Sequence, residues 1–136
     1  MDRIVVWYLR MSLIYFTAGA AIGFGMLIWP REFGSFTVVH AHLNLLGFMS
    51  MMIYGVGYHI LPRFMGRPVY SHRLGNIQVW LANITLMGLS ISWILEASQC
   101  GIWHIILILF GLGQGISVFL FIFNLWKSMT PQQGNS

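Results

Sequence analysis

The sequence predicts an all-α integral membrane protein with four transmembrane helices and no separate soluble domain. Of its 136 residues, 57% are hydrophobic and only 7% are charged, whereas a soluble domain carries about 25% charged residues. Four apolar stretches account for nearly the whole chain, and each has about the 20 residues that span a hydrocarbon core of roughly 30 Å. Lipid forces backbone groups to bond within their own segment, so each stretch is predicted to be a helix.

The four helices are expected to form one domain over 1–136, at 9–29, 37–61, 75–96 and 102–126. The first is predicted to be an uncleaved span, because its apolar stretch continues to Trp29 and is longer than a signal-peptide core. Pro30 and Pro62 follow the first and second stretches. They are expected to end those helices, because proline cannot continue a hydrogen-bonded helix.

Two glycine pairs predict close helix contacts, because glycines four residues apart let helix backbones approach each other. One pair is Gly19 and Gly23 in the first helix, and the other is Gly111 and Gly115 in the fourth. The fourth helix also carries a polar stripe that is expected to face protein rather than lipid and to hold helices together. Its residues are Gln114, Ser117 and Asn124.

The distribution of charge predicts the orientation in the membrane. Six of the basic residues fall on one side if the helices alternate: Arg3, Arg10, Arg63, Arg67, Arg73 and Lys127. The other side has Arg31 beside Glu32 in the first loop, and Glu96 in the last loop. The positive-inside rule therefore places both termini in the cytoplasm, and we expect a bacterial inner membrane. The net charge of +4 does not predict nucleic-acid binding, and the basic loop between the second and third helices is expected to contact anionic lipid headgroups.

Five histidines are the informative residues, because an ionisable side chain in a membrane helix is a functional candidate. His40 and His42 begin the second helix, and His104 begins the fourth, so all three are expected near the outer surface. His59 and His72 are expected near the cytoplasmic side. Any one of these histidines can also fill a hydrogen-bonded packing role.

The spacing of His40 and His42 limits what the two can bind. Two residues along an α-helix correspond to about 200° of rotation, so the imidazoles leave opposite faces and do not suit one metal ion. A mononuclear zinc site on a helix favours a spacing of four residues. Each histidine is therefore expected to serve a different partner, and neutral imidazole is a good ligand for haem iron.

The same stretch resembles the tenth transmembrane helix of the catalytic subunit of haem–copper oxidases. The resemblance runs without a gap from His40-Ala41-His42, through Gly55 and His59-Ile60-Leu61-Pro62, to Gly66. The start of this helix is also similar to a related family of membrane haem proteins of nitric-oxide stress. The resemblance implies one four-helix arc of an oxidase core that is built from three such arcs.

In the oxidases the H-x-H pair serves two haems, the first histidine binding the high-spin haem and the second the low-spin haem. The resemblance thus implies that His40 and His42 are haem ligands. The family's copper site uses a further adjacent histidine pair, which this sequence lacks. Copper stays an additional candidate, and haem b is the expected haem because no C-x-x-C-H attachment motif is present.

A homotrimer would restore the three-arc architecture, since a closed ring repeats one interface. A haem between His40 of one copy and His42 of the next would be six-coordinate. Arg31 is a candidate partner of the haem propionates, because guanidinium suits carboxylates, and a plain surface charge is the alternative. His104 is a candidate for a propionate hydrogen bond, an axial ligand or a copper ligand, with a structural role as the alternative.

Three functions remain open at this point. The first is a haem b protein that transfers electrons to or from a respiratory partner, or that responds to a gas. The second is a subunit of a haem- and copper-containing oxygen or nitric oxide reductase. The third is a cofactor-free assembly subunit of a respiratory complex. Haem content and metal stoichiometry discriminate between them.

Overall fold

The computed structural model describes residues 2–96 and 101–130, and each regular element in those ranges is a helix. The elements are α1 (Arg3–Ile28), α2 (Pro30–Phe33), η1 (Gly34–Phe36), α3 (Thr37–His42), η2 (Leu43–Ser50), α4 (Met51–Phe64), α5 (His72–Glu96) and α6 (Ile102–Met129). The segments α3, η2 and α4 follow one another without a break and form one rod. Four rods are long and apolar enough to cross a membrane, so the predicted all-α membrane fold is confirmed.

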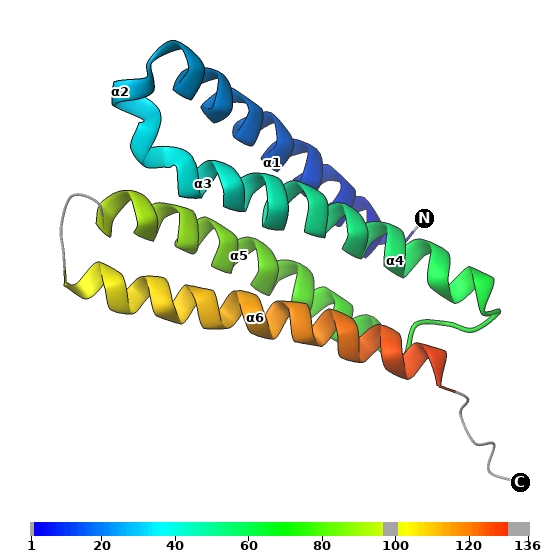
Figure 1. The fold of residues 1–136 in the computed structure, drawn as a ribbon. Coiled ribbons are helices and arrows are strands. Elements are labelled where there is room, and N and C mark those ends of the chain that lie inside the picture. The colour runs from blue at the N-terminus through cyan, green and yellow to red at the C-terminus, as the bar shows by residue number, and fades with distance from the viewer. Residues whose placement is uncertain (1, 97–100, 131–136) are drawn as a thin grey trace, which may run out of the picture.

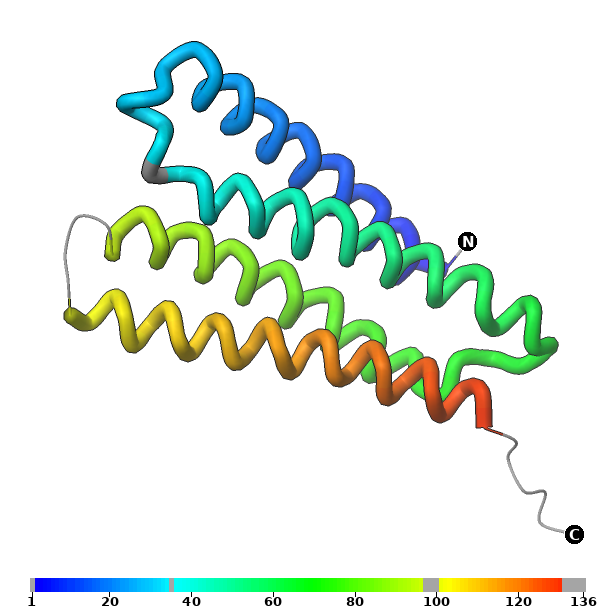
Figure 2. The backbone as a smooth tube through the Cα atoms, viewed as in Figure 1, coloured from blue at the N-terminus to red at the C-terminus, as the bar shows by residue number. Residues whose placement is uncertain are grey.

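The rods alternate in direction, so the start of α1 and the end of α6 lie at the same end of the bundle (Figure 1). We call this the terminal end, and we call the opposite end, which carries α2, the far end. Figure 2 shows the path of the backbone between the two ends. Helix α1 packs against the α3–η2–α4 rod, α5 packs against α6, and contacts of α5 with α1 and α3 join the two pairs.

The helices extend beyond the predicted stretches at the terminal end. Helix α1 begins at Arg3 rather than at residue 9, α5 begins at His72 rather than at 75, and α6 ends at Met129 rather than at 126. Packing explains the first extension, because Val5 and Tyr8 are only 2% and 0% exposed. Hydropathy marks the part of a helix that meets lipid, while tertiary packing stabilises turns beyond it.

The two prolines act differently. Pro30 is the first residue of α2, where its missing N–H is not needed, and α1 ends at Ile28 as the proline predicts. Pro62 lies inside α4, so the expectation that it ends this helix is wrong.

Helix α4 ends instead at Phe64, because Gly66 adopts a φ of +61° that a side chain disfavours. The amide of Gly66 donates to the carbonyl of Arg63 at 3.2 Å, and that of Arg67 donates to Pro62 at 3.0 Å. This pair of bonds is the Schellman arrangement, which satisfies the last carbonyls of a helix.

The polar stripe of α6 faces the protein, which confirms the prediction from sequence. Gln114 is 4% exposed, and both Ser117 and Asn124 are fully buried. Thr85 Oγ1 of α5 lies 2.6 Å from Gln114 Oε1, and Asn124 Nδ2 donates to the hydroxyl of Tyr58 at 3.2 Å. Such bonds between helices stabilise membrane bundles.

The two glycine pairs differ in their surroundings. A Cβ atom at Gly19 would lie 2.6 Å from Asn44 Nδ2, and one at Gly23 would lie 2.7 Å from His40 Cε1. These two glycines allow the close approach that their spacing predicts. In contrast, a Cβ at Gly111 or Gly115 would meet nothing within 4 Å, so this second pair makes no close contact in the described part of the chain.

Candidate functional site

His40 is held by a contact between two helices. Its Nδ1 atom lies 2.8 Å from the carbonyl oxygen of Gly19, which is 21 residues earlier on α1. A carbonyl can only accept a hydrogen bond, so Nδ1 carries the proton and Nε2 keeps its lone pair. This is the tautomer that a metal-ligating imidazole adopts, with the second nitrogen fixed by a backbone carbonyl.

The glycines of α1 make room for this arrangement. A side chain at Gly23 would collide with the imidazole ring of His40, and a side chain at Gly19 would collide with the amide of Asn44. Asn44 Nδ2 donates to the backbone carbonyl of His40 at 2.8 Å. It also lies 3.4 Å from Nδ1 of the same histidine. The orientation of His40 is therefore fixed from α1 and from the next turn of its own rod.

His42 is held within its own helix. Its Nδ1 atom lies 2.8 Å from the carbonyl oxygen of Val38, one turn earlier in α3. The same reasoning gives His42 a protonated Nδ1 and a free Nε2 lone pair. Both histidines are half-buried, and the buried Val39 and Leu43 lie beside them in the chain.

A π-helical segment begins directly after this pair. The residues of η2, from Leu43 to Ser50, bond in the wider pattern from each residue to the fifth one along, and such segments are frequent at functional sites. The hydroxyl of Ser50 donates to the carbonyl of Leu45 at 2.9 Å. Gly47 lies against Tyr15 of α1, where a Cβ would come within 2.6 Å of the tyrosine Cβ. The hydropathy and spacing of the sequence did not predict this segment.

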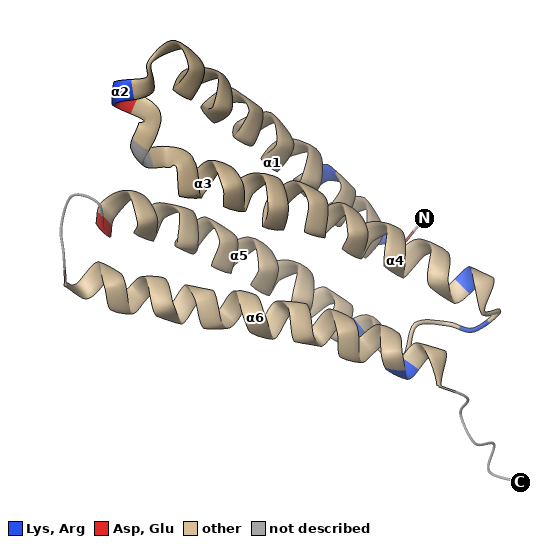
Figure 3. Ribbon diagram, in the orientation of Figure 1, with Lys and Arg blue, Asp and Glu red and all other residues tan. Residues whose placement is uncertain are grey.

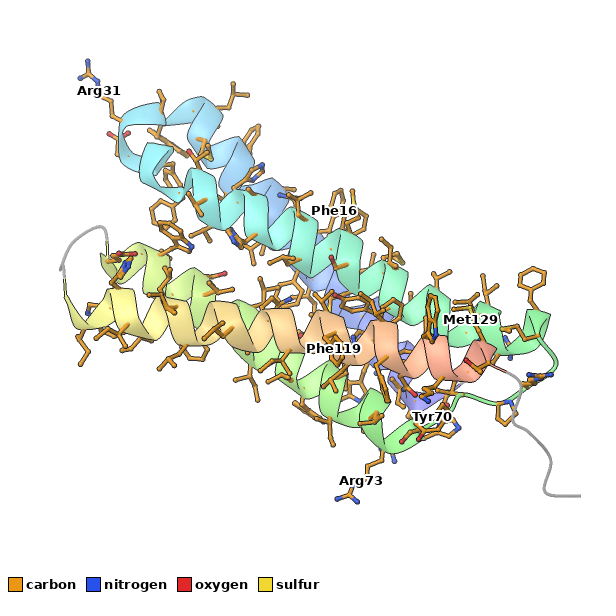
Figure 4. All side chains as sticks on the ribbon, turned by 60° about the horizontal axis from the view of Figure 1, so that its bottom comes forward. Phe16, Arg31, Tyr70, Arg73, Phe119 and Met129 are labelled. Carbon is orange, nitrogen blue, oxygen red and sulfur yellow. The ribbon has the colours of Figure 1, made fainter. Side chains whose placement is uncertain are left out.

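Arg31 and His104 lie at the far end, and in the described ranges neither makes a hydrogen bond with His40 or His42. Arg31 is an exposed residue of α2 and points away from the helices (Figure 4). His104 Nδ1 lies 2.6 Å from Glu96 Oε1, and the histidine side chain is 61% exposed. A carboxylate on Nδ1 leaves Nε2 of His104 free. In the described ranges, however, no group of three or more His, Cys, Asp or Glu residues is close enough to hold a metal ion.

His59 and His72 lie at the terminal end and have partners of their own. His59 contacts the guanidinium of Arg63, one turn later in α4. His72 Nδ1 lies 3.1 Å from a carboxylate oxygen of Asp2. The structure thus separates the five histidines into two groups at opposite ends of the bundle, and the H-x-H pair belongs to the far half.

The two imidazoles fit the ligation of a haem iron better than they fit a metal site built from several side chains of one chain. Each of His40 and His42 offers one neutral imidazole nitrogen, oriented by a carbonyl, which is what a haem iron takes from a protein as an axial ligand. A copper ion bound by several imidazoles needs more ligands than the described residues of one chain bring together. Such a site would need residues from another copy or another subunit.

Comparison with known proteins places this stretch in a family. The sequence model of the family described as "Cytochrome C and Quinol oxidase polypeptide I" matches residues 31–102, more than half of the chain. The match includes the H-x-H pair and extends through α5. No solved structure is significantly similar to the chain.

Two curated relatives align with about half of the chain. One is the cbb3-type cytochrome c oxidase subunit CcoN1 of Stutzerimonas stutzeri, 32% identical over 77 residues, which are 55% of this chain and 16% of the relative. The other is a cytochrome c oxidase subunit 1 homolog of Agrobacterium tumefaciens, 29% identical over 75 residues, which are 54% of this chain and 14% of that relative. The chain therefore corresponds to a small part of each oxidase subunit.

Proposed function

Because the chain belongs to the family of cytochrome c and quinol oxidase polypeptide I, we propose that it is a membrane-bound haem b protein that transfers electrons. In this proposal, His40 and His42 are the residues that would hold the haem iron. One observation carries it: both imidazoles donate Nδ1–H to backbone carbonyls, at 2.8 Å each, and keep Nε2 free. Nε2 is the atom through which each imidazole would bind the iron.

The two histidines serve one iron only if they come from different copies of the chain. Residues two apart on α3 point about 200° apart, so one copy cannot offer both to a single iron. In a homotrimer, His40 of one copy and His42 of the next would meet at each interface, and the same contact would repeat around the ring. Three copies would also supply as many helices as the three arcs of an oxidase core.

The residues of this chain prepare the ligands and their surroundings. The carbonyl of Gly19 accepts a hydrogen bond from Nδ1–H of His40, which fixes the ring and raises the basicity of its other nitrogen. The carbonyl of Val38 does the same for His42. Held by His40 and His42, a bound haem would supply one-electron transfer. Apolar helix faces around a bound haem would limit access of water and so tune its potential.

The distribution of charge supports an orientation with the terminal end in the cytoplasm. The terminal end carries most of the basic residues, while α2 and the end of α5 carry acidic residues (Figure 3). This asymmetry fits the positive-inside rule for a bacterial inner membrane. The H-x-H pair then lies in the outer half of the membrane, and its respiratory electron partner would be reached from that side.

The test is an optical spectrum of the detergent-purified protein, oxidised and then reduced, with and without carbon monoxide. We expect sharp reduced α and β bands that carbon monoxide does not change. His40→Ala and His42→Ala should each remove these bands, while the control His72→Ala should leave them intact. A preparation made with ample haem supply that contained no haem would contradict the proposal and favour a cofactor-free assembly subunit.

A second candidate is a subunit of a haem- and copper-containing oxygen or nitric oxide reductase. The oxidase names of both relatives favour it, as does the free Nε2 of His104 at the far end. Copper would then be bound by residues of more than one chain. A carbon monoxide shift together with stoichiometric copper would establish this candidate, whereas haem without copper would leave the electron-transfer protein.

A further inference from the structure

A basic hollow lies at the terminal end, away from the histidine pair, where the loop between α4 and α5 crosses the end of α6. Its volume is about 340 Å³, and it is lined by Arg67, Pro68, Val69, Tyr70, Lys127, Ser128 and Thr130. That volume lies within the range of about 300–1,000 Å³ that is usual for ligand pockets. We propose that this hollow binds the phosphate headgroup of an anionic membrane lipid.

The charge of the lining favours an anionic ligand. Arg67 and Lys127 bring two positive charges to one hollow, and none of the described residues that line it is acidic. Within the described ranges neither cation forms an ion pair, and Asp2 contacts His72 instead. The end of α6 carries about half a negative charge from its backbone, which two full positive charges outweigh. A phosphate diester would complete this set, because guanidinium and ammonium groups both bind phosphate oxygens.

Hydrogen bonds hold the hollow in shape. The amide of Tyr70 donates to Ser128 Oγ at 2.8 Å, and the amide of Ser71 donates to Asn124 Oδ1 at 3.0 Å. Asn124 Nδ2 in turn donates to the carbonyl of Ser71 at 2.9 Å. The loop that carries Arg67 is therefore fixed to the helix that carries Lys127, and the two cations line the same space.

The depth of the hollow fits a lipid headgroup. The hollow lies at the end of a membrane-spanning helix. Tyr70, which lines it, is 49% exposed, and Trp126, the neighbour of Lys127 in the chain, is 67% exposed. Tyrosine and tryptophan are typical of the headgroup level. Figure 4 shows Tyr70 at the end of α6. With the terminal end in the cytoplasm, the hollow faces the leaflet that carries anionic lipid.

The lipid class follows from the lining. Pro68 and Val69 offer apolar surface beside the two cations, which suits a glycerol backbone above a phosphate. A zwitterionic headgroup would bring its own cation towards Arg67 and Lys127. We therefore expect a preference for phosphatidylglycerol over phosphatidylcholine, and this preference does not depend on haem.

Native mass spectrometry of the full-length protein, with equimolar phosphatidylglycerol and phosphatidylcholine in the micelle, tests the proposal. We expect the double variant Arg67→Gln/Lys127→Gln to lose retained phosphatidylglycerol about 10- to 30-fold, at roughly 1 kcal/mol per basic residue near a membrane surface. The matched control Arg10→Gln/Arg73→Gln removes the same charge outside the hollow and should change retention less than about threefold. Figure 4 shows Arg73 pointing away from the helices.

The outcomes distinguish a lipid site from general charge attraction and from a site for a free anion. An equal loss in both double variants would mean general charge attraction and would overturn the proposal. Inorganic phosphate should displace the lipid no better than chloride of equal ionic strength. If phosphate displaced it selectively, the hollow would be a site for a free anion and the lipid proposal would fail. Because the exchanged side chains are exposed, the helical circular dichroism of both variants should match the wild type.

Discussion

The carbonyl oxygen of Gly19 lies 2.8 Å from Nδ1 of His40 and joins the first membrane-spanning helix to the start of the second. The two residues are 21 positions apart in the chain. Helix α1 can come this near because residues 19 and 23 are both glycines. A Cβ at Gly23 would collide with the imidazole of His40, and one at Gly19 would collide with the amide of Asn44. The orientation of a candidate haem ligand is thus set in part by a helix that carries no candidate ligand itself.

The first prediction concerns Gly23. Its replacement by alanine would place a Cβ 2.7 Å from Cε1 of His40, so the ring must move. Displacing a group that orients a ligand costs about 10-fold or more in metal affinity. We expect Gly23→Ala to lower haem affinity by about that factor, measured by titrating haem into the apoprotein. Gly111→Ala, which meets only open space, should bind haem as the wild type does.

The second prediction concerns Asn124, which ties the α4–α5 loop to α6. Its side chain makes hydrogen bonds with the backbone of Ser71 and the hydroxyl of Tyr58. At about 0.6 kcal/mol for each bond inside a membrane protein, Asn124→Ala should lower the free energy of unfolding by about 2 kcal/mol.

Unfolding of the Asn124 variant can be followed by circular dichroism in mixed micelles of increasing denaturing-detergent content. Asn76→Ala removes an exposed amide and should leave the midpoint unchanged. An Asn124 variant as stable as the wild type would show that these bonds contribute nothing net.

The third prediction concerns His104. Its side chain is 61% exposed, and its Nδ1 atom is hydrogen-bonded to Glu96, so it has a structural partner of its own away from the H-x-H pair. We expect His104→Ala to leave the haem spectrum, the haem content and the copper content unchanged. A loss of bound copper in this variant would instead support the reductase subunit.

The fourth prediction concerns topology. A fluorescent-protein fusion after Ser136 should be bright, because this reporter folds in the cytoplasm, whereas an alkaline phosphatase fused after Glu32 should be active outside it. The charge asymmetry between the two ends is the physical reason. The reversed pattern, a dark C-terminal fusion and an inactive phosphatase, would place the histidine pair in the cytoplasmic half.

The membrane fold was predictable from the sequence because lipid imposes a simple rule on length and apolarity. Four apolar stretches predicted four spans, and the polar stripe around Ser117 predicted which face of α6 is buried. The ends of the helices were less predictable. Tyr8 extends α1 through packing and not through hydropathy, and Gly66, rather than Pro62, ends α4 through its positive φ.

The candidate site was predictable in part. The spacing of His40 and His42 predicted that their side chains leave opposite faces of the helix, and the family resemblance predicted that they bind haem. The hydrogen bond from His40 to Gly19 was not predictable, since it joins residues on two helices through a backbone carbonyl that any residue possesses. The glycine spacings were equally ambiguous, because Gly19 and Gly23 meet a neighbour whereas Gly111 and Gly115 do not.

The π-helical segment has a consequence for how the second span is interpreted. Because η2 winds more widely than the α-helix on either side, it resets the rotational phase of the rod between His42 and Met51. A helical wheel that starts from the H-x-H pair and assumes about 100° per residue therefore places Tyr54 and Tyr58 on the wrong face of the rod. A substitution scan through this span should show a period of about 3.6 residues before Leu43, and the same period with a shifted phase after Ser50.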